Sequence, residues 1–161
     1  MNSGQPEGAE GRSLDGTGRR FGIVASRFHG AVVDRLVEGA VAALIAHGVL
    51  PEDIEVVRVP GAWEIPVALD ALARRGGFAA LMALGALVRG ETAHFSLIAD
   101  QCSRGVADIA LRRELPVTFG VLTCETMAQA HERAGGAEGN KGEEAALAAL
   151  EMAAVVARLR A

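Results

Sequence analysis

The amino-acid sequence predicts an α/β protein in which helices cover both faces of a parallel sheet. Short apolar runs alternate with longer segments whose apolar residues recur every three or four positions, as expected for strands followed by amphipathic helices. Short links join these segments, which favours parallel strand connections. Hydrophobic residues make up 50% of the chain and aromatic residues only 4%, so small aliphatic side chains should fill the core. The predicted fold is a three-layer α/β/α sandwich with a four-stranded parallel sheet.

The first strand is expected over residues 21–26, where a short apolar run ends at polar residues. A helix follows, and His47-Gly48 is a plausible stop for it. His29, just before this helix, is interpreted as a possible cap. The residues expected on its apolar face are Val32, Val33, Leu36, Val37, Val41, Leu44 and Ile45.

A second strand is expected over residues 54–59, closed by Pro60-Gly61. A short helix should begin near Trp63 and end before Gly76-Gly77. The run from 78 to 88 has almost no polar residue, so it predicts a third strand that is buried on both faces.

A long amphipathic helix should follow, because apolar residues recur at steps of three and four at Phe95, Ile98, Cys102, Val106 and Ile109. Residues 116–123 form the fourth predicted strand. Thr126 and Gln129 resemble a capping box that opens a short helix. A polar loop over residues 137–142 then leads to a final helix, whose expected apolar stripe is Leu147, Leu150, Val155 or Val156, and Leu159.

Length and composition indicate one domain over residues 19–161, preceded by a flexible tail over residues 1–18. The tail has no apolar segment of the kind a secretory signal needs, and the 78–88 run is shorter than the ~20 residues that span a bilayer. Cytoplasmic residence is the simplest interpretation. The net charge of −4 argues against nucleic-acid binding. No histidine or cysteine spacing suggests a metal site.

The most informative segment is the junction between the third strand and the long helix. Arg89, Glu91, Thr92 and His94 lie there within six residues. Ligands of α/β proteins bind at the carboxyl ends of strands, and helix N-termini favour anions. A histidine at this place can transfer protons near neutral pH. The junction therefore predicts an anion site with a proton carrier beside it.

Other strand ends supply further candidates with competing interpretations. Phe28 and Trp63 could stack on a flat heterocycle, or each could be a packed core residue. Glu64 could be a surface charge at a helix start, and Phe119, inside a strand, is by default a core residue. Arg133 and Lys141 flank a glycine-rich segment that is either a solvated connection or a phosphate clamp.

Several segments together resemble the lumazine synthase family, whose members make 6,7-dimethyl-8-ribityllumazine in riboflavin biosynthesis. The most specific are Pro-Gly-Ala-Trp-Glu-Ile-Pro at 60–66 and Arg-Gly-Glu-Thr-Ala-His at 89–94. The matching segments run in order through the chain and cover residues 22–28, 59–66, 84–94, 119–123, 132–135 and 139–142.

The resemblance implies a flavodoxin-like sandwich whose sheet an N-terminal strand from a neighbouring subunit can extend. It also implies a condensation of 5-amino-6-(D-ribitylamino)uracil with 3,4-dihydroxy-2-butanone 4-phosphate, without cofactor or metal. His94 matches the catalytic proton carrier of the family. The implied contacts to the pyrimidine and its ribityl chain are Phe28, Ala62, Trp63, Glu64, Ala86, Leu87, Val88, Phe119 and Lys141, with Lys141 near the phosphate. The implied phosphate ligands are Glu91, Thr92 and Arg133.

Family members form pentamers, in which Phe119 reaches into the pocket of the adjacent subunit. Some members assemble twelve pentamers into an icosahedral cage, and the short segment at 135–142 resembles theirs. The resemblance thus implies a homo-oligomer. A 60-subunit particle is expected, and a free pentamer or a decamer are the alternatives. Riboflavin synthase is a further candidate partner. The competing functions are a flavin- or lumazine-binding module and a catalytically silent shell protein of the same fold.

Overall fold

The computed structural model describes residues 12–161. The main strands are β1 (Phe21–Ser26), β2 (Ile54–Val59), β3 (Ala80–Val88) and β4 (Val117–Cys124). The α-helices are α1 (Gly30–Ala46), α2 (Ile65–Arg75), α3 (His94–Arg113), α4 (Met127–Glu132) and α5 (Lys141–Leu159). Short additional elements are the 3₁₀ turns η1 (Pro51–Asp53) and η2 (Ala62–Glu64) and the strands β5 (Ala134–Gly136) and β6 (Gly139–Asn140).

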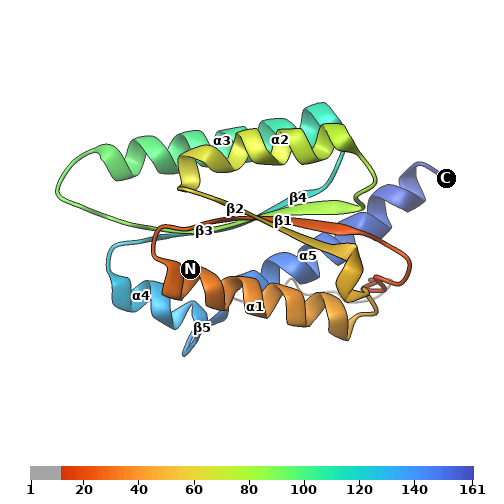
Figure 1. Ribbon diagram of the computed structural model, residues 1–161, viewed down its shortest axis with the longest axis horizontal. Coiled ribbons are helices and arrows are strands. Elements are labelled where there is room, and N and C mark those ends of the chain that lie inside the picture. The colour runs from red at the N-terminus through yellow and green to blue at the C-terminus, as the bar shows by residue number, and fades with distance from the viewer. Residues whose placement is uncertain (1–11) are drawn as a thin grey trace.

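The four main strands form one parallel sheet in the order β2-β1-β3-β4. Helices α2 and α3 cover one face, and α1, α4 and α5 lie on the other, so the molecule has three layers (Figure 1). The chain moves from β1 to β2 on one side and later to β3 on the other, which creates a switch point between β1 and β3. The predicted flavodoxin-like sandwich is confirmed.

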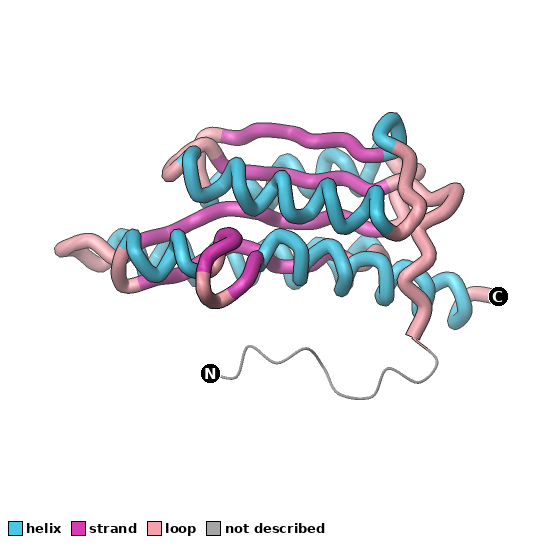
Figure 2. Tube along the Cα trace, turned by 90° about the horizontal axis from the view of Figure 1, so that it is seen from below, coloured by secondary structure: helices cyan, strands magenta, loops and turns pink. Residues whose placement is uncertain are grey.

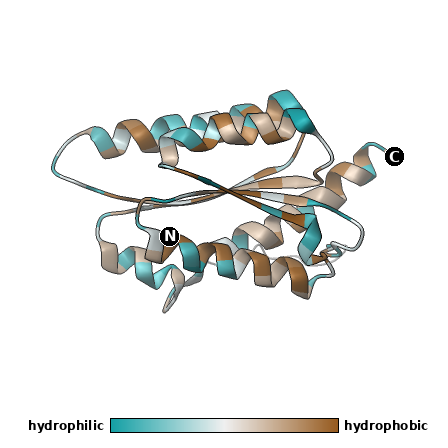
Figure 3. Ribbon diagram, viewed as in Figure 1, coloured by the Kyte–Doolittle hydropathy of each residue, from teal (hydrophilic) through white to brown (hydrophobic). Residues whose placement is uncertain are grey.

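The centre of the sheet is buried on both faces. Every residue of β1 is buried, and β3 is buried from Ala80 to Ala86, which confirms the expectation for this run. Hydrophobic residues dominate these strands, whereas hydrophobic and hydrophilic residues alternate along the helices (Figure 3). Two hydrophobic clusters result, one beneath α1 and α5 and the other beneath α2 and α3. Within residues 12–161, no helix is long and apolar enough to cross a membrane.

The buried face of α5 differs from the predicted stripe. Of the expected residues, Leu150 is fully buried, Leu147 is partly buried, and Leu159 is 76% exposed. The buried residues are instead small: Gly142, Ala145, Ala146, Ala149 and Ala153 accompany Leu150. These small residues allow α5 to pack closely beside α1 (Figure 2). A Cβ atom at Gly142 would overlap the backbone carbonyl of Leu36. Val155 and Val156 are half-buried. The predicted stripe is therefore right in part: it contains Leu150 and Leu147, but it omits the small residues that make up most of the buried face.

The segment between α4 and α5 also departs from the expected loop, because it forms the small antiparallel hairpin of β5 and β6 (Figure 2). The capping box before α4 is confirmed in part. Thr126 Oγ1 accepts a hydrogen bond from the Gln129 N–H at 3.2 Å. The Gln129 side chain, however, accepts from the Glu125 N–H at 2.9 Å and so braces the corner after β4.

Residues 12–18, expected as part of a flexible tail, contact the helices in this structure. Arg12 pairs with Glu151 of α5 at 2.8 Å. The Gly16 N–H donates to the His47 carbonyl at 2.8 Å, and Leu14 packs against the core beneath α1 and α5. The remainder of the expected tail, residues 1–11, lies outside the described residues.

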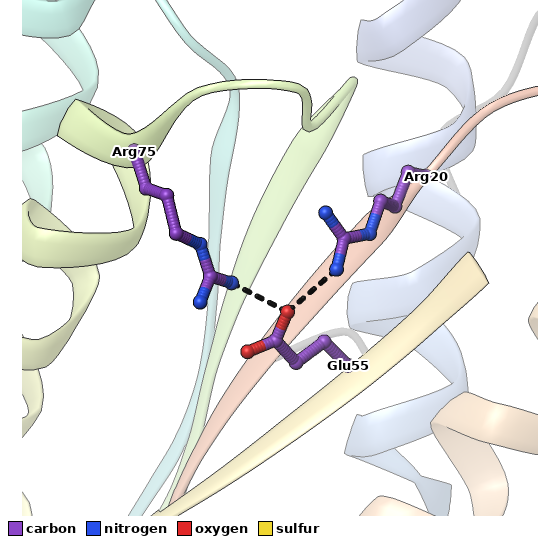
Figure 4. A network of polar contacts seen from close by, with 3 residues as sticks. All are labelled: Arg20, Glu55 and Arg75. Carbon is purple, nitrogen blue, oxygen red and sulfur yellow. Dashed lines mark hydrogen bonds and ion pairs between the residues drawn. The ribbon is translucent and has the colours of Figure 1, made fainter. Parts of the chain in front are cut away.

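Glu55, near the amino end of the edge strand β2, joins two arginines (Figure 4). Its Oε2 accepts a hydrogen bond from Arg20 Nη2 at 2.8 Å and a second from Arg75 Nη2. Both guanidinium groups also lie over the Phe78 ring, at 4.7 and 5.6 Å from its centroid. The hydrogen bond from Arg75 lowers the pKa of Glu55 despite partial burial, which acts in the opposite direction.

Replacing this carboxylate should lower stability in a pH-dependent way. We expect Glu55→Gln to reduce the free energy of unfolding at pH 7 by about 1 kcal/mol, a small value because solvent screens partly exposed ion pairs. The folded-state pKa is lowered, so the wild-type contribution is complete above the ordinary glutamate pKa of about 4.3 and is lost as the pH falls through the folded-state value. Urea unfolding from pH 7 to pH 2 measures both effects.

Arg104→Gln is the matched control, because Arg104 forms an exposed ion pair with Asp100 within α3 and should change stability much less. Equal stabilities of the Glu55 variant and wild type at pH 7, or a difference that persists at the lowest pH, would contradict the prediction.

Candidate active site

A cavity of about 870 Å³ opens at the carboxyl ends of β1, β2 and β3, at the switch point between β1 and β3. Four segments line it: the residues after β1, the turn after β2, the end of β3, and the start of α3. The lining residues are Phe28, His29, Gly61, Ala62, Trp63, Glu64, Ala86, Leu87, Val88, Gly90, Thr92, His94, Phe95, Leu97, Ile98 and Gln101.

The cavity exists because β1 ends earlier than its neighbour. The pairing of β1 with β3 stops at Ala25 and Leu84, whereas β3 continues beside β4 as far as Val88. Beyond Leu84, the edge of β3 that faced β1 has no strand partner among residues 12–161. The backbone of Ala86, Leu87 and Val88 can therefore offer hydrogen bonds to a ligand.

Two aromatic side chains from the loops after β1 and β2 also line the cavity. Phe28 is 68% exposed and Trp63 is 58% exposed, so the interpretation of either as a packed core residue is wrong. The Phe28 N–H lies 3.2 Å from the Pro60 carbonyl, which joins the loops after β1 and β2. Large aromatic faces left open in a cavity can stack on a flat ligand.

Glu64 has a structural role in the turn that carries Trp63. Its Oε2 accepts a hydrogen bond from the Gly61 N–H at 2.9 Å, which fixes the chain just before η2. The same carboxylate lines the cavity, and its other oxygen has acceptor capacity for a ligand. Glu64 is therefore more than a surface charge at a helix start, because it also fixes this turn and lines the cavity.

The junction before α3 brings Thr92 and His94 to the cavity. Ala93 occupies the N-cap position, where its methyl group cannot accept a hydrogen bond. The His94 N–H is 3.4 Å from Thr92 Oγ1, a long contact. The amides at this helix start are thus open to an anion, beside an exposed histidine that can exchange protons.

Other candidates lie outside the cavity. Glu91 is exposed but does not line it. Phe119 is 44% exposed, which overturns its interpretation as a core residue, and it lines a separate hollow of about 380 Å³ together with Phe95 and Thr123.

Arg133 and Lys141 also lie away from the cavity of their own chain. Arg133 follows α4, and its Nη1 donates to the Gln129 carbonyl at 3.2 Å. Lys141 begins α5, and its Nζ pairs with Glu144 Oε2 at 2.7 Å. The Lys141 N–H donates to the Arg133 carbonyl at 2.9 Å, so the two cations share one corner of the molecule.

A family model described as 6,7-dimethyl-8-ribityllumazine synthase matches residues 18–157. The chain belongs to this family. A 6,7-dimethyl-8-ribityllumazine synthase of Aquifex aeolicus (strain VF5) is 55% identical to it over 147 residues, which cover 91% of this chain and 96% of that protein. The resemblance stated from the sequence motifs is confirmed, and with it an enzyme of riboflavin biosynthesis. The flavin-binding and silent-shell alternatives are not favoured.

Sequence reasoning missed several residues that line the cavity of this lumazine synthase family member. Phe95 and Ile98 fitted the apolar stripe of α3, but the first turns of this helix are only half-buried there, and its fully buried residues begin at Cys102. His29 was interpreted as a helix cap. It does occupy the N-cap position, with φ 55°, but its side chain makes no capping hydrogen bond and lines the cavity. Its position next to Phe28 in the sequence was the signal that could have identified His29 as a cavity residue.

The two cysteines are unsuited to nucleophilic catalysis. Burial raises the pKa of Cys102 to about 11, so its thiol is protonated at neutral pH. Burial also raises the pKa of Cys124, against the opposing effect of the Arg133 charge. Among residues 12–161, no group of histidine, cysteine and acidic residues is arranged to hold a metal ion. Two imidazoles, His29 and His94, line the cavity. His94 is the candidate for proton transfer because it lies beside the open start of α3.

Proposed function

We propose that the chain condenses 5-amino-6-(D-ribitylamino)uracil with 3,4-dihydroxy-2-butanone 4-phosphate to give 6,7-dimethyl-8-ribityllumazine, phosphate and water. The observation that carries this proposal is the cavity itself, which combines exposed aromatic rings with His94 at an open helix start. Family membership supplies the reaction, and the cavity supplies surfaces suited to a flat pyrimidine and to a phosphate.

The pyrimidine and its ribityl chain are assigned to the side of the cavity formed by β1, β2 and β3. Phe28 stacks on the ring, and the backbone of residues 86–88 hydrogen-bonds its polar edge. Ala62, Trp63 and Glu64 contact the ring and the ribityl hydroxyls. The exposure of both aromatic side chains and the unpaired edge of β3 support this assignment.

The phosphate of the second substrate is assigned to the start of α3. Backbone N–H groups near Glu91 and Thr92 bind it, favoured by the helix dipole. The Glu91 carboxylate would repel the phosphate, so only its backbone is assigned this role. Arg133 is proposed as the guanidinium ligand.

Proton transfer by His94 is the proposed catalytic contribution. The substrate amine attacks the ketone, and loss of water gives an imine; elimination of phosphate, ring closure and a second loss of water complete the product. These steps require protons to be moved, and a positioned histidine typically contributes ~10²–10⁴-fold. Holding both substrates in reactive alignment accounts for a further large part of the acceleration.

The complete site is proposed to form only in a homo-oligomer. Phe119, Arg133 and Lys141 lie outside the cavity of their own chain, so each is assigned to the cavity of a neighbouring copy. Exposed apolar side chains on α2 and α3 offer surface for such contacts, among them Val67 and Leu111, at 71% and 80% exposure. We propose that the chains form pentamers, which assemble into a 60-subunit cage. This particle acts in the cytoplasm and can associate with riboflavin synthase. An added N-terminal strand from a neighbouring chain would pair with the edge of β2.

The decisive experiment mixes the purified protein with both substrates and follows the absorbance of the lumazine product. We expect product formation, and we expect His94→Ala to slow kcat by about 10²-fold because general acid–base help is lost. The variant should elute at the wild-type mass, since His94 is exposed. Absence of product with wild type would refute the function, and a wild-type rate in the variant would remove His94 from proton transfer.

Arg133→Ala tests the phosphate assignment. Removing the guanidinium should raise the KM for the butanone phosphate about tenfold, within the range of one charge-assisted hydrogen bond, with little change in the KM for the pyrimidine. Arg158→Ala, on the last turn of α5, is the control. Equal increases in both KM values would indicate general damage to the site rather than loss of a phosphate ligand.

The assembly proposal predicts a particle far larger than the 16.6 kDa chain. Multi-angle light scattering should give the mass of sixty chains. A mass near five or ten chains would leave the shared site intact but refute the cage, and a monomer with full activity would refute the shared site.

A further inference from the structure

Arg89 was expected to belong to the anion site, but its side chain points to a different partner. Its Nε donates to both carboxylate oxygens of Glu125, at 3.0 and 2.8 Å. Its guanidinium carbon lies 4.6 Å from the centroid of the Phe95 ring. Arg89 is not among the residues that line the cavity, so it does not contact a ligand held there by this chain.

Glu125 lies at a corner whose backbone is held by hydrogen bonds. It directly follows β4, and its N–H donates to Gln129 Oε1 at 2.9 Å, while Gln129 is itself bonded to Thr126. The Arg89 N–H donates to the Cys124 carbonyl at 2.9 Å, which extends the contact between β3 and β4 by one residue. The corner after β4 is therefore tied to the corner after β3 through both backbone and side chain.

The segment that Arg89 anchors has few other contacts. Residues 89–94 are exposed, and they connect β3 to α3 in a loop that projects at one end of the molecule (Figure 1). Within this segment the side-chain hydrogen bonds are the Arg89 pair and the 3.4 Å contact between Thr92 and the His94 N–H. Thr92 and His94 are the residues whose positions matter most for the proposed chemistry.

Phe95 connects the pair of Arg89 and Glu125 to the cavity wall. Phe95 lines both the main cavity and the hollow that contains Phe119. The Arg89 guanidinium covers this ring, which restricts its movement. A shift of Phe95 would also shift His94, because the two residues form the first turn of α3.

We infer that Arg89 is a positioning residue: its bond to Glu125 and its contact with Phe95 hold the first turn of α3, and thereby His94 and Thr92, in the geometry that the reaction needs. This inference rests on the proposed function. Both side chains of the pair are largely exposed, at 45% and 61%, so the pair contributes little to global stability. Its effect should appear in catalysis, since displacement of a catalytic group by about 1 Å costs ~10²-fold in rate.

The test compares Arg89→Gln, Glu125→Gln and the double variant in the synthase assay. We expect each single variant to lower kcat/KM about tenfold, mainly through kcat, with an unchanged urea unfolding midpoint. The double variant should lose no more than either single one, because both changes break the same contact. Arg89→Lys should recover part of the rate, since an ammonium keeps the charge but cannot reproduce the guanidinium geometry.

Arg112→Gln is the matched control, because Arg112 forms an exposed ion pair with Asp108 near the far end of the same helix; its kcat/KM should equal that of wild type. Hydrogen exchange gives a second readout that needs no activity: amides of residues 92–97 should exchange faster in Arg89→Gln and not in Arg112→Gln. Three results would each refute the positioning role of Arg89: a kcat/KM within twofold of wild type in Arg89→Gln, additive losses in the double variant, or unchanged exchange. An inactive wild type would refute the proposed function, and the exchange data would still show whether Arg89 holds the first turn of α3.

Discussion

Burial of the parallel sheet on both faces is the constraint on which the rest of this structure depends. With β1 wholly buried and β3 buried from Ala80 to Ala86, the polar backbone groups in the middle of the sheet bond to neighbouring strands. Ligands can reach the strands only at their ends. Parallel strands place all their carboxyl ends at one edge, so the side chains that follow β1, β2 and β3 meet there although they are far apart in the sequence.

The cavity follows from two features of the fold. Strand β3 runs past the end of β1, which leaves a backbone edge open, and the start of α3 is only partly covered by the body of the protein. Phe95 and Ile98 consequently line the cavity, although Ile98 also packs against the core beneath α2 and α3. The proposed chemistry depends on a segment with few anchors of its own, which gives the contact of Arg89 with Glu125 an importance that its exposure alone would not suggest.

The other face of the sheet shows how close packing fixes a second set of residues. Gly142 lets α5 approach the backbone of α1 near Leu36. Asn140 caps α5 through the N–H groups of Gly142 and Glu143 and donates to the Arg35 carbonyl at 2.9 Å. Lys141 is held between these contacts, so its backbone position is determined by helix packing and not by the cavity of its own chain.

The sequence by itself determined the order of strands and helices, because strand and helix periodicities differ, and it determined the family, because the blocks at 60–66 and 89–94 are specific. It also identified most of the cavity lining through the residues that follow strands. Only the tertiary structure decided that Phe28, Trp63 and Phe119 are exposed, that α5 packs through alanines, and that Arg89 binds Glu125. Exposure and side-chain partners depend on distances between elements, and a linear pattern specifies which face of an element is apolar but not how closely its neighbours approach.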